Sequence, residues 1–284
     1  MYAEAEAAYR DVWVRRRRAL GENHADTLRA LYMLGKALYD QEKYAEAEGV
    51  YRDAWEARKR AFGSHHEDTL ASLSALGDVL CEQGMYAEAE VAYRDIWVRR
   101  KRAIGESHAD TLRSLYVLGS AIHNQGKFAE AEGVYQKAWE SRKRAIGEDH
   151  EDTLASLAAL GDALCGQGKY AETEAAYRDV WVRRRRVIGE NHAGTLSSLH
   201  VLGRALFVQK EYLEAEVVYR DAWEGRRRTL GWEYEDTLTS LYWQGRALYG
   251  QKTYAEAEAV FRDACGGRKR VLGDQNSDTL HSLH

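Results

Sequence analysis

The segment that decides the fold is residues 26–61, with the sequence DTLRALYMLGKALYDQEKYAEAEGVYRDAWEARKRA. Its anchor residues return after 42 positions, and the pattern continues to the C-terminus. The anchors are Leu28, Gly35, Tyr44, Ala47, Tyr51, Trp55 and Gly63. A constant period of this length is typical of a solenoid, in which each unit packs against its neighbours. The 284 residues are therefore predicted to form a single array over 1–284.

Each unit contains two amphipathic helical patterns separated by a short turn. In helix A, near 27–41, leucines follow the i, i+3, i+4, i+7 spacing of one buried face, and Asp26 and Thr27 are predicted to cap the N-terminus. In helix B, near 44–61, small residues share a stripe with Tyr51 and Trp55. The short turn at 41–44 indicates that the two helices form an antiparallel hairpin.

The same pattern gives the bounds of every unit and an all-α fold class. A lone helix B is predicted at 2–20 and a partial helix A at 278–284. Between them lie six hairpins, at 26–61, 68–103, 110–145, 152–187, 194–229 and 236–271. A second period of 84 residues lies over the first, which indicates duplication of a block of two hairpins.

Composition limits the classes of partner. The net charge of −4 gives no basic field that would draw the whole chain to nucleic acid or to an anionic membrane. No apolar run is long enough to span a membrane, and the N-terminus lacks the features of a signal peptide. We expect a cytoplasmic protein, with Cys81, Cys165 and Cys265 as free thiols.

Several residue types recur in every unit and therefore indicate structure rather than chemistry. The histidines that precede each helix A are predicted to form hydrogen bonds in the loops rather than to bind metal or to catalyse. They are His24, His66, His108, His150 and His192. The repeated tryptophans fall on the apolar stripe of helix B and are predicted to lie in the core between hairpins. We expect no enzyme activity, no metal site and no cofactor.

Basic runs end each helix B, and they allow a second interpretation. They are Arg15–Arg18, Arg58–Arg60, Arg99–Arg102, Arg142–Arg144, Arg183–Arg186 and Arg226–Arg228. Such a rail could contact successive phosphates, so nucleic-acid binding is an alternative. The favoured interpretation is that these cations stabilise helix C-termini and are neutralised by neighbouring acids.

The repeat resembles the tetratricopeptide repeat. That family has large residues around a Leu-Gly pair in helix A, and small residues around an aromatic one in helix B, as in Leu34-Gly35 and Tyr51 here. The 42-residue unit is similar to the kinesin light chain subtype, which also occurs in the sensor arrays of fungal and bacterial NOD-like (STAND-type) proteins. The resemblance implies a right-handed superhelical solenoid whose A helices line the concave groove.

In such a groove, the positions of helix A outside its apolar stripe would face a ligand. Rows with aromatic and basic side chains alternate with rows of small and acidic ones, until two aromatic-basic rows stand side by side near the C-terminus. The candidate binding residues are Arg29, Tyr32, Lys36, Tyr39, Asp78, Arg113, Tyr116, His123, Asp162, His200, Arg204, Phe207, Tyr242, Arg246 and Tyr249. Exposed aromatic and arginine side chains are the residues that binding hot spots use.

The predicted function is non-catalytic binding of a peptide or protein segment. The resemblance to kinesin light chains implies an acidic segment with an aromatic anchor, held by the last two rows. An architectural alternative is head-to-tail self-association, because both predicted ends cut through a unit and expose apolar faces. Sedimentation at several concentrations would separate the two, since a monomeric groove does not associate.

Overall fold

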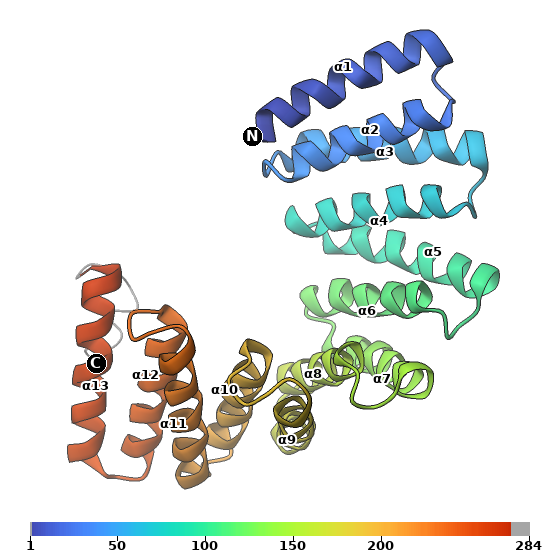
Figure 1. Cartoon of the computed structure of the whole chain (residues 1–284). Coiled ribbons are helices and arrows are strands. Elements are labelled where there is room, and N and C mark those ends of the chain that lie inside the picture. The colour runs from blue at the N-terminus through green and yellow to red at the C-terminus, as the bar shows by residue number, and fades with distance from the viewer. Residues whose placement is uncertain (1, 274–284) are drawn as a thin grey trace. The chain divides into compact units, whose positions relative to one another are not determined.

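The structure is a computed structural model that describes residues 2–273, and within them it contains thirteen helices and no strand. The helices alternate as B and A partners of successive hairpins (Figure 1). They are α1 (Tyr2–Leu20), α2 (Ala25–Tyr39), α3 (Tyr44–Phe62), α4 (Glu67–Glu82), α5 (Tyr86–Ile104), α6 (Ala109–Asn124), α7 (Phe128–Ile146), α8 (Glu151–Gly166), α9 (Tyr170–Val187), α10 (Ala193–Val208), α11 (Tyr212–Thr229), α12 (Glu235–Gly250) and α13 (Tyr254–Leu272). The prediction of an all-α helical repeat array is confirmed. The partial helix predicted at 278–284 lies outside the described residues.

The chain divides into two compact units, residues 1–145 and residues 146–284. The first unit contains α1 to α7 and the second contains α8 to α13. In both units A helices pack between two B helices, as α2 does between α1 and α3 and α10 does between α9 and α11. The single array and its superhelical hand stay predictions, so each unit is described by itself. None of the helices in the described range combines the length and the hydropathy that crossing a membrane requires.

The loop histidines cap the A helices. In α2 the helix begins at Ala25, and the Nδ1 atom of His24 accepts a hydrogen bond of 3.2 Å from the backbone N–H of Asp26. His66, His108, His150 and His192 do the same in later units. Their predicted hydrogen-bonding role is confirmed. The assignment of Asp26 and Thr27 as N-caps was wrong, because Asp, Ser, Thr and Asn are the usual caps and histidine was not considered.

The core of each hairpin is built on contact between a glycine of helix A and an aromatic ring of helix B. A Cβ atom at Gly35 would lie only 2.8 Å from the ring of Tyr51, so the absence of a side chain allows the ring to cross the helix. The same contact recurs from Gly77 to Tyr93 and from Gly203 to Tyr219. Tyr51 is buried and Tyr219 is fully buried. The repeated Leu-Gly pair therefore sets the spacing of the two helices.

The tryptophans of helix B are half-buried at the edge of the core, where Trp181 packs against the buried cluster of its unit. Each carries a cation over its ring, such as Lys59 over Trp55 at 4.8 Å and Arg227 over Trp223 at 4.9 Å. The cations lie one helical turn after the rings, so they cover the faces that the core leaves open. The apolar stripe of helix B is therefore narrower than the sequence indicated.

Candidate functional site

The predicted binding residues lie on the A helices, and in the first unit many of them are held by neighbouring side chains. Tyr32 of α2 is half-buried, with its ring 5.4 Å from that of Tyr51 and with the Arg58 guanidinium 4.8 Å above it. Tyr116 of α6 repeats this arrangement beneath Arg142, at 5.0 Å. These two tyrosines therefore join the packing between helices and offer only part of their surface to a ligand.

Of the remaining candidates in the first unit, some bond to or pack against neighbouring side chains, and the others are exposed to solvent. The hydroxyl of Tyr39 donates to Glu82 at 3.2 Å, and burial together with that carboxylate raises the pKa of Tyr39 to about 12. Asp78 accepts a hydrogen bond of 2.5 Å from the hydroxyl of Tyr93. His123 lies edge-on to Phe128. Arg29, Lys36 and Arg113 are exposed.

In the second unit the candidates on α10 and α12 come together around Arg246. Its exposed guanidinium lies 5.7 Å from the ring of Phe207, 6.0 Å from Tyr242 and 5.6 Å from Trp243. It also donates a hydrogen bond of 3.2 Å to the Tyr242 hydroxyl. The rings of Phe207 and Trp243 meet edge to face at 5.5 Å. A cation thus lies over a continuous aromatic surface, which we call the aromatic face.

Two further rings of the second unit are exposed at the turn between α12 and α13. Tyr249 is 60% exposed and Tyr254 is 55% exposed, with ring centroids 5.2 Å apart. At the opposite side, Arg204 of α10 is exposed and donates to the sulfur of Cys165 at 3.2 Å. Asp162 of α8 accepts a hydrogen bond of 2.7 Å from Tyr177. The second unit therefore presents open aromatic rings and two exposed arginines on adjacent A helices.

Sequence reasoning missed Trp243 as a member of this face. The residue stacks on Tyr219, with ring centroids 6.0 Å apart and an interplanar angle of 21°. Other units have Met33, Ala75 or Val117 at this position, which was not among the positions expected to face a ligand. The sequence did contain a signal at this site, because two successive positions depart from the repeat: Trp243 is unique at its position, and Gln244 replaces the leucine that follows in other units.

Half-buried His200 makes the stability of the second unit depend on pH. Burial, followed by Arg226 and Arg204, lowers the pKa of His200 to about 4. An unfolded histidine titrates near pH 6.5, so between about 6.5 and about 4 the unfolded chain binds a proton that the folded chain does not. Stability is therefore expected to fall by about 2–3 kcal/mol as the pH drops through this range.

The matched variant for this pH dependence is His200→Tyr, since Tyr32 and Tyr116 occupy the same position in other units. Urea unfolding of both chains at pH 7 and near pH 4 measures the difference that is due to His200. Equal losses of stability in the two proteins would show that His200 does not cause the effect.

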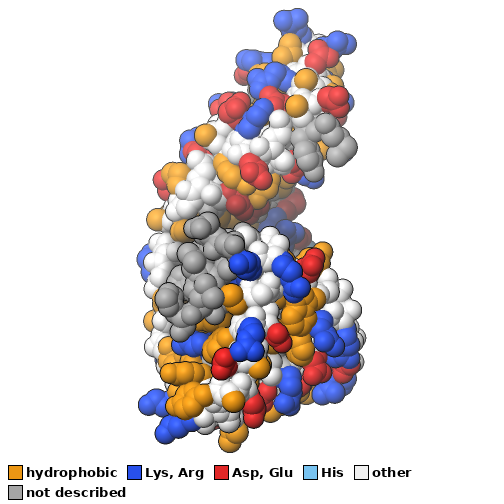
Figure 2. All heavy atoms as spheres, turned by 90° about the vertical axis from the view of Figure 1, so that its left-hand side faces the viewer, with side chains coloured by type: hydrophobic (Ala, Val, Ile, Leu, Met, Phe, Trp, Pro, Cys, Tyr) orange, Lys and Arg blue, Asp and Glu red, His pale blue; other side chains and the backbone are white. Residues whose placement is uncertain are grey.

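The arginine rail is partly structural, which the sequence did not show. Arg226 is buried, and its Nη1 atom donates to the carbonyl of Asp236 at 3.0 Å and to Ser240 Oγ at 2.7 Å. Arg58 and Arg100 repeat the bond to the serine that lies 14 residues later. On the face of the described residues in Figure 2, basic and acidic side chains are interspersed. The predicted neutralisation by neighbouring acids is confirmed by ion pairs such as Arg183–Glu148 at 3.0 Å.

The comparisons with known proteins agree with this repeat geometry. Profiles described as tetratricopeptide repeat match residues 1–60, 37–96, 110–180, 159–228 and 245–278. The chain belongs to the tetratricopeptide repeat family. Repeats of this family generally mediate protein–protein interaction, and arrays of this kind are typically non-catalytic scaffolds. Within residues 2–273 no group of three or more His, Cys, Asp and Glu side chains is placed to hold a metal ion.

Solved structures with this fold include kinesin light chain-like arrays. The tetratricopeptide-like repeats of a putative kinesin light chain from Podosopora anserina are 21% identical, with a TM-score of 0.66, and the match covers 75% of this chain and 99% of that one. BtubC (BKLC) from P. vanneervenii is 16% identical, with a TM-score of 0.69 and coverage of 81% and 92%. The quorum sensor NprR from B. thuringiensis is 12% identical, with a TM-score of 0.66 and coverage of 99% and 78%. No curated protein matches the sequence.

Proposed function

We propose that the aromatic face of the second unit binds a peptide or protein segment that combines acidic and aromatic residues. The observation that carries the proposal is Arg246, whose exposed guanidinium lies within 6.0 Å of three aromatic rings. A carboxylate can pair with the guanidinium from the solvent side, while an aromatic side chain stacks beside it. Arg204 supplies a second exposed cation on the neighbouring A helix.

The exposed rings support binding of an apolar anchor. Tyr249 and Tyr254 are more than half exposed, and tyrosines of this kind give large contact areas at low entropic cost. In both units a tyrosine of helix A lies beneath an arginine of the next B helix, as Tyr32 does under Arg58 and Tyr242 under Arg268. The second unit adds the exposed Arg246 and the exposed rings of Tyr249 and Tyr254. The proposed site is therefore on α10 and α12, with Arg204, Phe207, Tyr242, Arg246 and Tyr249 among its residues.

Selection of peptides from a random display library against the immobilised full chain tests this function. We expect the enriched sequences to carry Asp or Glu within a few residues of Trp, Tyr or Phe. Enrichment of basic sequences, or no enrichment over an uncoated surface, would contradict the proposal. The wider sensor context and head-to-tail association stay predictions.

A further inference from the structure

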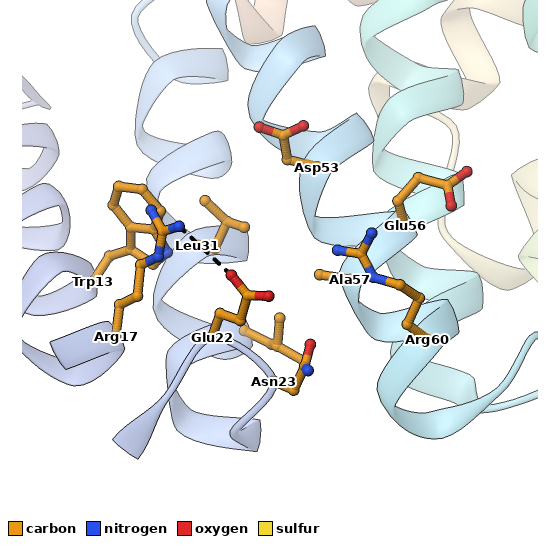
Figure 3. Close-up of a pocket in the computed structure, with 10 residues that line it drawn as sticks. Trp13, Arg17, Glu22, Asn23, Leu31, Asp53, Glu56, Ala57 and Arg60 are labelled. Atoms are coloured by element: carbon orange, nitrogen blue, oxygen red, sulfur yellow. Dashed lines mark ion pairs between the residues drawn. The ribbon is translucent and has the colours of Figure 1, made fainter. Parts of the chain in front are cut away.

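A groove lies between the two B helices α1 and α3 of the first unit, and none of the A-helix candidates lines it. It has a volume of about 410 Å³, and Leu28 and Leu31 of α2 contribute to its lining. Figure 3 shows Trp13 and Arg17 of α1 on one side and Asp53 of α3 on the other. Glu22 projects into the groove from the loop that follows α1.

One corresponding groove of the same chain holds a lysine ammonium. Between α5 and α7, 84 residues later, Trp97 and Glu106 take the places of Trp13 and Glu22. There α7 carries Lys137, whose ammonium lies 4.7 Å from the Trp97 ring centroid and 3.1 Å from the Glu106 carboxylate. In the groove between α1 and α3 the position that corresponds to Lys137 is Asp53.

A second cation near the indole does not exclude an ammonium. In the groove of α5 and α7, Lys101 also lies 5.6 Å from the Trp97 ring and 3.1 Å from Glu106, so one ring and one carboxylate serve two cations. In the groove of α1 and α3, Arg17 corresponds to Lys101. It lies 5.5 Å from the Trp13 ring and 3.5 Å from Glu22. In this groove, the position that corresponds to the Lys137 ammonium is therefore next to the Trp13 ring and the Glu22 carboxylate.

One carboxylate of the groove, that of Asp53, is available to a cationic occupant. Asp53 is exposed and has no ion-pair partner among the described residues, whereas Glu56 is engaged by Lys59 at 3.9 Å. Asp53 thus adds a second carboxylate where α7 carries an ammonium. Arg60 also lines the groove. At the corresponding position of α7, Arg144 donates to the Glu140 carbonyl of its own helix while Lys137 reaches Glu106, so an arginine at this position is compatible with a bound ammonium.

We propose that the groove between α1 and α3 binds a lysine side chain of a partner segment, in the way that the groove between α5 and α7 holds Lys137. The aliphatic stem would lie against Trp13, and the ammonium would pair with Glu22 and Asp53. This site is independent of the aromatic face, because it uses other helices and a ligand of opposite charge.

Titration of the full chain with N-acetyl-lysine N-methylamide tests the proposal, with the indole N–H signals observed by NMR. The Trp13 signal is assigned through a Trp13→Phe variant. We expect a saturable shift of this signal with a Kd of about 1 mM or above, as for a single side chain. The norleucine analogue, which has the same stem without the ammonium, is expected to cause no such shift.

Two reciprocal variants make the test specific. Asp53→Lys supplies an ammonium from α3 and is expected to weaken the Trp13 response at least about fivefold, because the new lysine side chain then occupies the site. Lys137→Asp opens the groove of α5 and α7 and is expected to give the Trp97 indole a response that the unmodified chain lacks. Circular dichroism verifies that both variants fold. An unresponsive Trp13, an equal response to norleucine, or unchanged binding by Asp53→Lys would overturn the proposal.

Discussion

Reversing the charges of Arg204 and Arg246 together, as Arg204→Glu and Arg246→Glu, is expected to weaken binding of a selected acidic, aromatic peptide by about 2–4 kcal/mol, or roughly 30- to 1,000-fold in Kd. The change removes two cations and places like charges against the ligand, which adds repulsion to the lost attraction. Arg246 matters most, since it also lies over Phe207 and Trp243. Isothermal titration calorimetry of both proteins measures the difference.

The matched control reverses two exposed arginines of the B helices, Arg185→Glu and Arg227→Glu, and so changes the net charge by the same amount. These arginines lie over Trp181 and Trp223 and away from the aromatic face. The control is expected to change affinity by less than about threefold, as for remote charges screened by salt. An equal loss in both double variants would show that the peptide responds to net charge alone.

Placing a branched side chain at Gly203 is expected to destabilise the second unit by about 2–3 kcal/mol. A Cβ atom there would lie 2.8 Å from the ring of Tyr219. That ring cannot move aside easily, because it is fully buried with Trp243 stacked 6.0 Å away. Urea unfolding of Gly203→Val, together with hydrogen exchange to localise the effect, measures the loss.

Gly266 provides the opposite control for this prediction. It lies within α13, and a Cβ atom there would meet nothing within 4 Å. Gly266→Ala is therefore expected to stabilise the chain by about 0.5–1 kcal/mol, because alanine favours the helix. Adding Tyr219→Leu to Gly203→Val should recover part of the lost stability, whereas strictly additive losses would mean that the contact with Tyr219 is not the cause.

The fold could be predicted from the sequence because packing residues repeat. Leu28, Gly35 and Tyr51 recur in every unit with little change, so their spacing alone indicates two helices and a short turn. The helices observed from Ala25 to Tyr39 and from Tyr44 to Phe62 lie within two residues of the first predicted pair.

The candidate site was harder to predict, because periodicity gives the direction of a side chain but not what covers it. Tyr32 leaves the helix on the expected side, yet Arg58 reaches it from the next B helix. The arginine itself was assigned to the surface, since a run of basic residues does not show which member bonds to Ser72. Only the spacing of 14 residues between the repeated Arg and Ser could have indicated that bond.

The most direct test of the proposed function is NMR of the eight tryptophan indoles during titration with a selected acidic, aromatic peptide. Trp243 belongs to the aromatic face, whereas Trp223 lies under Arg227 on helix B and serves as an internal reference. The proposal predicts that the Trp243 indole signal shifts with the same Kd as calorimetry gives, while the Trp223 signal stays constant. Binding that shifts Trp223 and leaves Trp243 unchanged would contradict it.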